Sequence, residues 1–166
     1  MSHPDDLTQR AEKVARSIAH VATREGRTVA LAESLTGGKI SCHLGAAPDS
    51  SDWFGGCVVA YTSEVKRRVL GVPDGPVVSK EAAAAMAKGA ADLLGCDLAV
   101  AVTGVGGPEE QDGEPPGTVW FGVCDRGTVT TELHRWDGEP EEVLDRTTLH
   151  ALTLLERVLD AHAAPS

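Results

Sequence analysis

Residues 29–38 read Val29-Ala30-Leu31-Ala32-Glu33-Ser34-Leu35-Thr36-Gly37-Gly38, and Lys39 to Leu44 follow them. The apolar run Val29 to Leu31 predicts a buried strand, and residues 32–38, which end in two glycines, predict a turn. Lys39 to Leu44 is predicted to begin a helix. Free N–H groups at a helix start attract anions, and glycine lets a ligand approach the backbone closely. A serine in such a turn stands at the edge of the sheet where α/β enzymes keep their sites.

The composition is that of a globular protein with an aliphatic core. The 166 residues suit one domain, 1–166, with an ordered core at 7–159; 42% are hydrophobic and 4% aromatic. The formal net charge of −10 predicts no nucleic-acid partner. Because no segment approaches the roughly 18 apolar residues of a membrane span, we expect no membrane partner and a cytoplasmic protein. The four irregularly spaced cysteines predict reduced, mostly buried thiols and no zinc site.

Helical periodicity alternates with apolar, strand-like runs along most of the chain. Helices are predicted at 7–25, 38–44, 63–70, 80–94 and 141–162, and strands at 28–31, 54–61, 97–102, 118–124 and 128–136. Thr62 and Ser79 are expected to cap helices, and Gly26, Gly71 and Gly95 to end them. The alternation predicts an α/β sandwich with a largely parallel sheet, made mixed by the closing hairpin.

The turn after the first strand has two interpretations. A serine between a strand and a helix is more commonly an N-cap than a nucleophile. The two glycines and Thr36 favour an anion site. Glu33 could orient a hydroxyl or a ribose, or it could lie at a solvated strand end.

Two further segments could carry chemistry. Tyr61 is the only tyrosine and ends the predicted strand 54–61, and Lys66 follows one turn into the next helix. A partly desolvated lysine can act as a general base for a serine, although a core tyrosine and a surface lysine would fit the spacing as well. Residues 103–108, Thr-Gly-Val-Gly-Gly-Pro, could wrap a phosphate or form a flexible surface loop. We find no histidine beside these strand ends and no carboxylate–histidine cluster for a metal.

Four motifs in this order resemble the CinA C-terminal domain family, the nicotinamide-nucleotide amidohydrolases or NMN deamidases. They are 32–38 (Ala-Glu-Ser-Leu-Thr-Gly-Gly), 61–66 with 70–72 (Tyr-Thr-Ser-Glu-Val-Lys and Leu-Gly-Val), 103–108, and 116–119 (Pro-Gly-Thr-Val). The resemblance covers residues 7–159 and corresponds to a stand-alone form, without the molybdopterin-binding-like domain of larger members. It implies a three-layer α/β/α sandwich with a mixed, mostly parallel sheet. It also implies hydrolysis of nicotinamide mononucleotide to nicotinate mononucleotide and ammonia in pyridine-nucleotide salvage, without a cofactor or metal.

The resemblance also implies roles for individual residues. Ser34 would be the nucleophile, Lys66 its base, and Tyr61 would assist proton transfer or hold the lysine. Residues expected to bind substrate or the developing oxyanion are Glu33, Thr36, Gly37, Gly38, Thr103, Gly104, Gly106, Gly107 and Arg146. The chain departs from the family pattern at Leu35 (often cysteine), Ser63 (commonly asparagine) and Gly106 (usually alanine). Residues 109–114 are more acidic than a phosphate neighbour should be, so we expect them to point to solvent.

Other functions fit parts of this pattern. A non-catalytic nucleotide-binding or regulatory module would keep the glycine turns, and a hydrolase could act on another amide or on a phosphate ester. The partner expected in each nucleotide-based interpretation is a small molecule. Trp53, Phe54 and Trp136 could form a contact within a homo-oligomer or could simply be core residues.

Overall fold

The structure, a computed structural model, describes residues 4–163 and 165. Its helices and strands follow one another in this order: α1 (Pro4–Glu25), β1 (Val29–Glu33), α2 (Lys39–Gly45), α3 (Ser50–Trp53), β2 (Phe54–Val59), α4 (Ser63–Leu70), α5 (Lys80–Leu94), β3 (Leu98–Gly104), β4 (Thr118–Asp125), β5 (Thr128–Arg135) and α6 (Pro140–Ala161). Among these helices, none is both long and apolar enough to cross a membrane.

The strands form one mixed sheet in the order β2-β1-β3-β4-β5. β1 pairs in parallel with β2 and with β3, whereas β4 pairs antiparallel with β3 and with β5. Only β4 therefore runs against the other four strands. The predicted mixed, mostly parallel sheet is confirmed.

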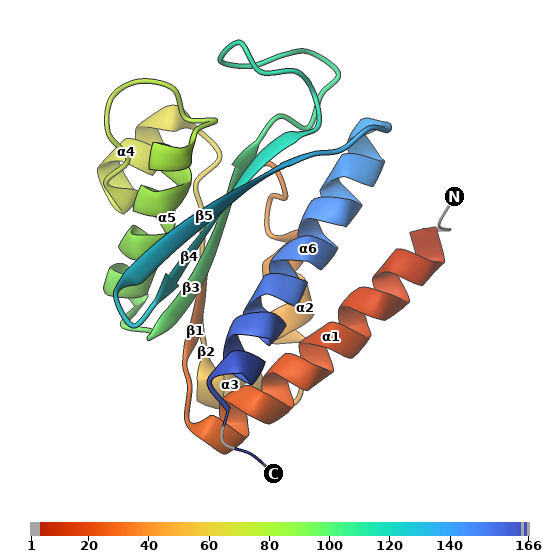
Figure 1. Ribbon diagram of the computed structural model, residues 1–166, viewed down its shortest axis with the longest axis vertical. Helices are drawn as coiled ribbons and strands as arrows, with labels where there is room; N and C mark the ends of the chain where they lie inside the picture. The colour runs from red at the N-terminus through yellow and green to blue at the C-terminus, as the bar shows by residue number, and fades with distance from the viewer. Residues whose placement is uncertain (1–3, 164, 166) are drawn as a thin grey trace.

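Helices cover both faces of the sheet and make three layers (Figure 1). On one face α1 and α6 lie side by side, with α2 and α3 next to them. On the other face α5 packs on the sheet and α4 packs on α5. The α/β/α sandwich is confirmed.

The two faces of the sheet carry side chains of different size. Along β1 and β3, alternate residues such as Leu31 and Val100 belong to the core under α1 and α6, whereas Ala30 and Ala99 belong to the core under α5. The buried face of α5 is itself mostly alanine. Small residues on the helix and on the sheet let α5 approach the sheet closely. The approach is so close at Gly122 of β4 that a Cβ there would collide with the Ala83 carbonyl of α5.

Local signals placed most helix ends correctly. The hydroxyl of Thr62 accepts a hydrogen bond from Val65 N at 3.3 Å, and that of Ser79 accepts one from Ala82 N at 3.1 Å. Gly71 and Gly95 end α4 and α5 at φ 72° and 64°, values that glycine tolerates best. The short helix α3 was not predicted, because four residues carry no helical periodicity.

Two expectations about burial need correction, and one open alternative is decided. β2 is an edge strand and is only partly buried, so Tyr61 does not end a buried strand. Cys124 alone among the four thiols is buried, and all four are free. Trp53 is buried, and Phe54 and Trp136 pack partly buried against the same core, so core packing accounts for all three.

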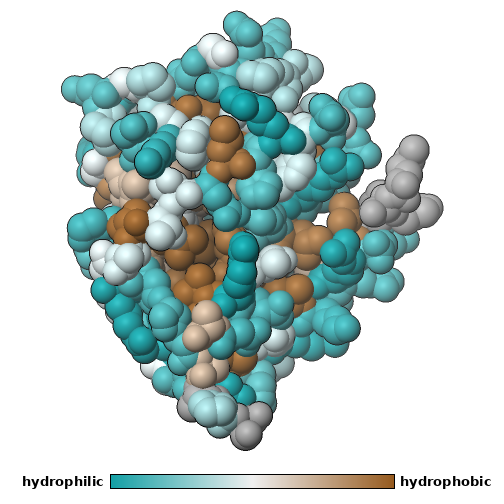
Figure 2. All heavy atoms as spheres, viewed as in Figure 1, coloured by the Kyte–Doolittle hydropathy of each residue, from teal (hydrophilic) through white to brown (hydrophobic). Residues whose placement is uncertain are grey.

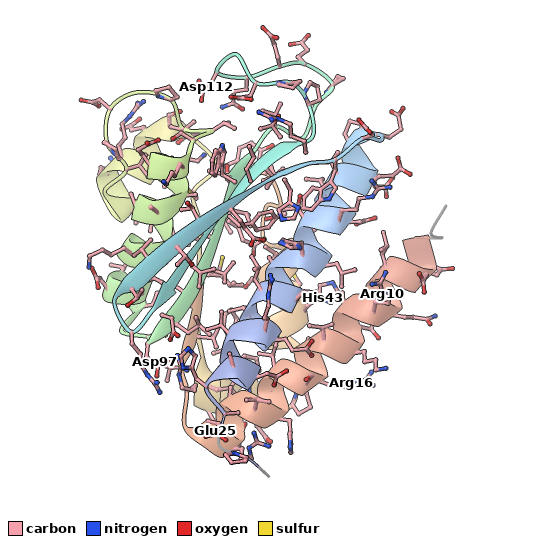
Figure 3. All side chains as sticks on the ribbon, viewed as in Figure 1. Arg10, Arg16, Glu25, His43, Asp97 and Asp112 are labelled. Carbon is pink, nitrogen blue, oxygen red and sulfur yellow. The ribbon has the colours of Figure 1, made fainter. Side chains whose placement is uncertain are left out.

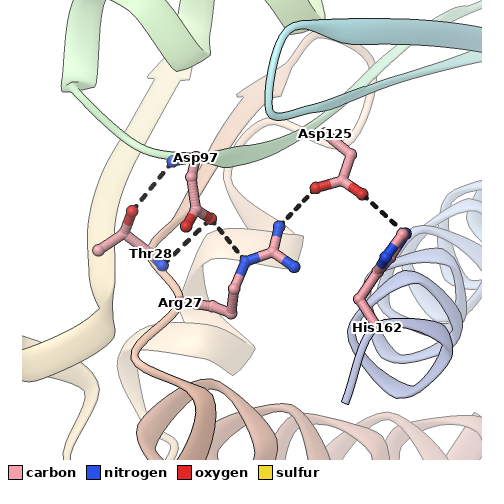
Figure 4. Close-up of polar contacts among 5 residues, drawn as sticks. All are labelled: Arg27, Thr28, Asp97, Asp125 and His162. Carbon is pink, nitrogen blue, oxygen red and sulfur yellow. Dashed lines mark hydrogen bonds and ion pairs between the residues drawn. The ribbon is translucent and has the colours of Figure 1, made fainter. Parts of the chain in front are cut away.

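An ion-pair network joins the start of β1, the start of β3 and the end of β4, at the edge of the sheet opposite Ser34 and Thr103. Arg27, only 3% exposed, donates from Nε to Asp97 at 3.0 Å and from Nη2 to Asp125. His162, at the end of α6, contacts Asp125 from its other side at 3.2 Å (Figure 4). Burial acts to lower the pKa of Arg27, but hydrogen bonds to the two carboxylates outweigh it and raise the pKa. The guanidinium thus holds β1, β3 and β4 together through charge-assisted hydrogen bonds.

We expect Arg27→Met to destabilise the fold by about 3 kcal/mol, because it leaves two carboxylates without their partner. Asp97 is one-third exposed, which keeps the cost at the lower end of the range for buried pairs. Urea unfolding followed by circular dichroism measures the change. Arg24→Met is the control, because Arg24 is 40% exposed and pairs with its sequence neighbour Glu25, and it should change stability by less than about 0.5 kcal/mol. Equal losses in the two variants would contradict a special role for Arg27.

Candidate active site

Three strand ends meet at one edge of the sheet. β1 lies between β2 and β3, and all three point their carboxyl ends the same way. The chain leaves β1 toward β2 and later returns to β3 on the other side of β1. Such a switch in strand order opens a crevice beyond the strand ends, where α/β proteins bind ligands.

A cavity of about 350 Å³ lies at this edge. Seven of the residues predicted from sequence line it: Ser34, Tyr61, Lys66, Thr103, Gly104, Gly106 and Gly107. The other lining residues are Leu35, Val78, Val105, Glu109, Glu110, Gln111, Pro140 and Leu144. The three motif segments therefore form one site, together with the start of α6.

Lys66 is the buried cation of this cavity. It is 2% exposed, and its Nζ donates to the Tyr61 carbonyl oxygen at 3.2 Å. Burial lowers the pKa of Lys66 to about 8, and the negative charge of Asp112 acts in the opposite direction. A substantial fraction of this amine is therefore neutral slightly above neutral pH, as a general base requires. The surface-lysine interpretation is wrong.

Tyr61 contributes differently from the expectation. Tyr61 is 69% exposed, so this tyrosine is not part of the core. The atom of Tyr61 that holds Lys66 is the backbone carbonyl oxygen, and not the phenol.

Ser34 directly follows β1 and is 7% exposed. It is not a helix cap, because α2 begins five residues later at Lys39, with Gly38 at its N-cap and no side-chain capping bond. Among the described residues, no hydrogen bond joins the Ser34 hydroxyl to Lys66; Nζ donates to Tyr61 instead. The serine and the lysine thus share a cavity without forming a hydrogen-bonded pair in this structure.

Glu33 binds the start of α2 from inside the protein. Its fully buried carboxylate accepts hydrogen bonds from the N–H groups of Gly38, Ile40 and Ser41 at 3.2, 3.1 and 2.9 Å. The Thr36 hydroxyl donates to it at 2.6 Å, and the Cys57 thiol lies at 3.5 Å. Burial and the charge of Glu33 raise the pKa of Cys57, so this thiol stays protonated. The helix start does bind an anion, and that anion is a side chain of the same chain.

This arrangement corrects the expected anion turn. Glu33 and Thr36 bond to each other and do not line the Ser34 cavity, and the idea of a solvated Glu33 is wrong. Gly37 and Gly38 line a different hollow beside Lys39 and His43, so their amides are not oxyanion donors for Ser34. Their φ angles of 58° and 108° explain the glycines, because other residues rarely adopt such values.

The segment after β3 is built tightly on its neighbours. The Thr103 hydroxyl donates to the Val77 carbonyl at 2.6 Å, and the residue is 1% exposed. A Cβ at Gly104 would lie 2.6 Å from the Thr118 carbonyl oxygen, so only glycine fits there. Gly106 and Gly107 follow as bare backbone along the cavity wall. This segment is therefore a fixed wall rather than a free surface loop.

The acidic loop borders the site while most of its residues stay exposed to solvent. Asp112 accepts hydrogen bonds from the N–H groups of Val77 and Val78 at 2.8 and 3.0 Å, which ties the loop to the segment before α5 (Figure 3). Glu109 and Glu110 line the cavity as a result. The expected exposure of residues 109–114 is confirmed for residues 109–113, and Glu114 is half-buried. Sequence spacing missed the role of Asp112, because its partners lie about 35 positions away.

Arg146 does not line the cavity. It is exposed on α6, and its Nη1 donates to the Asp137 carbonyl at 3.0 Å. Arg146 therefore lies apart from the predicted residues that share the cavity. Pro140 and Leu144, which the sequence analysis did not single out, form the α6 side of the cavity. Lys66 is the only lysine or arginine among the described lining residues.

A family model described as the CinA C-terminal domain matches residues 11–159. The chain belongs to this family. A CinA-like protein of Geobacter metallireducens is 38% identical over 91% of the chain, and one of Mycobacterium tuberculosis is 41% identical over 81% of it. The CinA domain described here spans only 38% and 33% of the length of those two relatives.

Solved structures of the family share the fold. The competence damage-inducible protein A of Klebsiella pneumoniae superposes with a TM-score of 0.87 at 34% identity, covering 92% of this chain and 98% of that one. A competence-damaged protein (CinA) superfamily protein of Escherichia coli gives 0.86 at 33% identity, covering 95% and 94%.

We expect Glu33→Gln to destabilise this CinA domain by about 2–3 kcal/mol, because several N–H donors lose a charged acceptor. Amide hydrogen exchange at Ile40 and Ser41 should accelerate in the variant. Glu12→Gln, which changes an exposed glutamate paired with Arg16 at 3.9 Å, is the control and should have little effect. Unchanged exchange at the start of α2 would contradict the assigned role of Glu33.

Lys66 should make stability depend on pH. Its folded-state pKa of about 8 lies below the ordinary 10.5, so the unfolded chain binds more protons between these pH values and stability rises there. Lys66→Met removes the charge that must be buried. We expect the variant to be more stable at pH 7 by up to about 3 kcal/mol, with the difference shrinking as the pH rises above 8.

Urea unfolding at a series of pH values measures this difference. Lys13→Met, which replaces an exposed lysine of α1, is the control and should track the parent chain. A constant offset between Lys66→Met and the parent chain at every pH would contradict a lowered pKa for Lys66.

Proposed function

We propose that this CinA domain hydrolyses the carboxamide of nicotinamide mononucleotide, giving nicotinate mononucleotide and ammonia for pyridine-nucleotide salvage. The observation that carries the proposal is the shared cavity of Ser34 and the buried Lys66, whose pKa is about 8. A binding module has no need for an amine that is buried at this cost and kept partly neutral. Family membership is consistent with the proposal, although the names of the relatives specify no reaction.

In the proposed reaction, neutral Lys66 Nζ accepts the hydroxyl proton while Ser34 Oγ attacks the carboxamide carbon. Lys66 then returns that proton to the departing nitrogen, and ammonia leaves behind an acyl-serine. Water, activated by the same amine, hydrolyses this ester. The backbone N–H groups of Gly106 and Gly107 are our candidates for oxyanion donors, replacing those first expected at Gly37 and Gly38.

This mechanism requires Ser34 and Lys66 to move closer when substrate binds. Catalytic hydrogen bonds are often long or poorly aligned without substrate and tighten in the complex. The hydrogen bond from Lys66 to the Tyr61 carbonyl uses one amine proton and leaves the nitrogen lone pair available in the neutral form.

The charges around the cavity favour one end of the substrate. Glu109 and Glu110 suit the positive pyridinium ring, whose charge also makes the carboxamide carbon easier to attack. A phosphate beside these carboxylates would be repelled, and Lys66 alone supplies positive charge among the described lining residues. We therefore propose that the ring enters the cavity and that the phosphate stays at its mouth.

The direct test is ammonia release from nicotinamide mononucleotide. We expect Ser34→Ala to lose at least about 1000-fold in kcat/KM, because the nucleophile is gone. Ser50→Ala is the matched control, since Ser50 bonds to Gly45 outside the cavity, and it should keep full activity. For the parent chain, kcat/KM should rise with pH through about 8 as Lys66 loses its proton.

Other outcomes would redirect the assignment. Saturable calorimetric binding of pyridine nucleotides without turnover would identify a non-catalytic module. Nicotinamide riboside keeps the cationic ring and lacks the phosphate. If it is turned over as fast as nicotinamide mononucleotide, this would support binding of the pyridinium ring in the acidic cavity. Undiminished activity of Ser34→Ala would reject Ser34 as the nucleophile.

A further inference from the structure

A second group of reactive side chains lies outside the Ser34 cavity. Glu132 and His134 of β5 meet His150 of α6, and one ligand atom from each lies within 4.8 Å of the others. The Nε2 atoms of both histidines point at the same carboxylate oxygen, Glu132 Oε1, at 3.0 Å for His134 and in a closer hydrogen bond for His150. The expectation from sequence that the chain holds no carboxylate–histidine cluster is therefore wrong.

The fold explains why these three residues converge. Glu132 and His134 are two positions apart on β5 and so share one face of the strand, and His150 of α6 contacts Glu132 on that face. Their side chains are 35% and 34% exposed, and that of His150 is 21% exposed. The contact spans 18 positions of sequence, which is why spacing alone did not reveal it.

Aromatic rings fix the orientation of both imidazoles. The edge of Phe121 packs against His134 and His150, with ring centroids 5.6 and 4.7 Å apart. Trp136 stacks on His134 at 5.2 Å with only 24° between the ring planes. Such support limits the rotamers open to the two histidines and preorganises the directions of their nitrogens.

We propose that Glu132, His134 and His150 form a binding site for a divalent transition metal of the zinc type. Two imidazole nitrogens and one carboxylate oxygen are a common zinc ligand set that leaves a fourth position for water. Zinc bonds of about 2.0–2.1 Å would set neighbouring ligand atoms about 3.3 Å apart. This spacing lies inside the 4.8 Å within which the three ligand atoms are grouped. The metal takes the place of the imidazole protons that now face the carboxylate.

The surroundings provide access for the ion. Glu132 also lines a groove of about 600 Å³ between β5 and the second half of α6. Figure 2 shows apolar side chains gathered between these two elements, and the groove residues Val123, Leu154 and Val158 are of this kind. Arg157 Nη2 lies 4.0 Å from Glu132 Oε2, but this arginine is 60% exposed and can turn into solvent. A bound metal would link edge strand β5 to α6.

The competing explanation is a metal-free hydrogen-bonded cluster, and zinc titration separates the two. With purified full-length chain and zinc chloride in calorimetry, we expect one equivalent to bind. His134→Gln and His150→Gln should each weaken binding at least tenfold, and Co²⁺ should give a visible absorption band only in the parent chain. Zinc should also raise the melting temperature of the parent chain more than that of either variant.

The matched control is His162→Gln. His162 is the C-cap of the helix that carries His150 and also pairs with a carboxylate, Asp125, but it is outside the cluster. The His162→Gln substitution should leave zinc affinity unchanged. If a histidine variant does not fold, Glu132→Gln tests the same site and should also weaken binding at least tenfold. No binding by the parent chain, or an equal loss in His162→Gln, would overturn the proposal.

Discussion

The site depends on one buried carboxylate. Glu33 ends β1, the strand between β2 and β3, and its oxygens accept the first N–H groups of α2. These bonds fix where the helix begins and which way the intervening turn bends. Ser34 is the first residue of that turn, so its position on the cavity wall follows from the carboxylate beside it. A buried charge is tolerated here because several aligned donors compensate it.

A second contribution to the site, besides the Glu33 carboxylate, is the division of the core into large side chains on one face of the sheet and small ones on the other. On the α5 face, alanine meets alanine and the helix lies close to the sheet. The segment before α5 can then reach both the Thr103 hydroxyl and the Asp112 carboxylate through the backbone of Val77 and Val78. The wall that buries Lys66 is thus a consequence of how closely α5 packs.

Local patterns in the sequence predicted an α/β sandwich, the mixed sheet and the caps at Thr62 and Ser79, because these depend on residues close together in the chain. The three layers and the pairing of Ser34 with Lys66 came from the resemblance to the CinA C-terminal domain family. Other contacts between distant segments were not predicted. Nothing in the spacing distinguishes a Glu33 that binds the helix from one that binds a ligand, or directs Arg146 toward Asp137 rather than substrate.

A buried cation lies at each end of the sheet, Arg27 at one and Lys66 at the other. Their hydrogen-bond partners differ, and this difference suits Arg27 to a structural role and Lys66 to the chemical role proposed above. Arg27 has two carboxylates within hydrogen-bond reach, which keep its charge in place. Lys66 has one carbonyl oxygen as its hydrogen-bond partner and only the field of Asp112 in support, so burial dominates and the pKa falls to about 8. An arginine could not give up its proton in that position, whereas a lysine can. A lysine at position 66 therefore suits the proton transfer that we propose for this cavity.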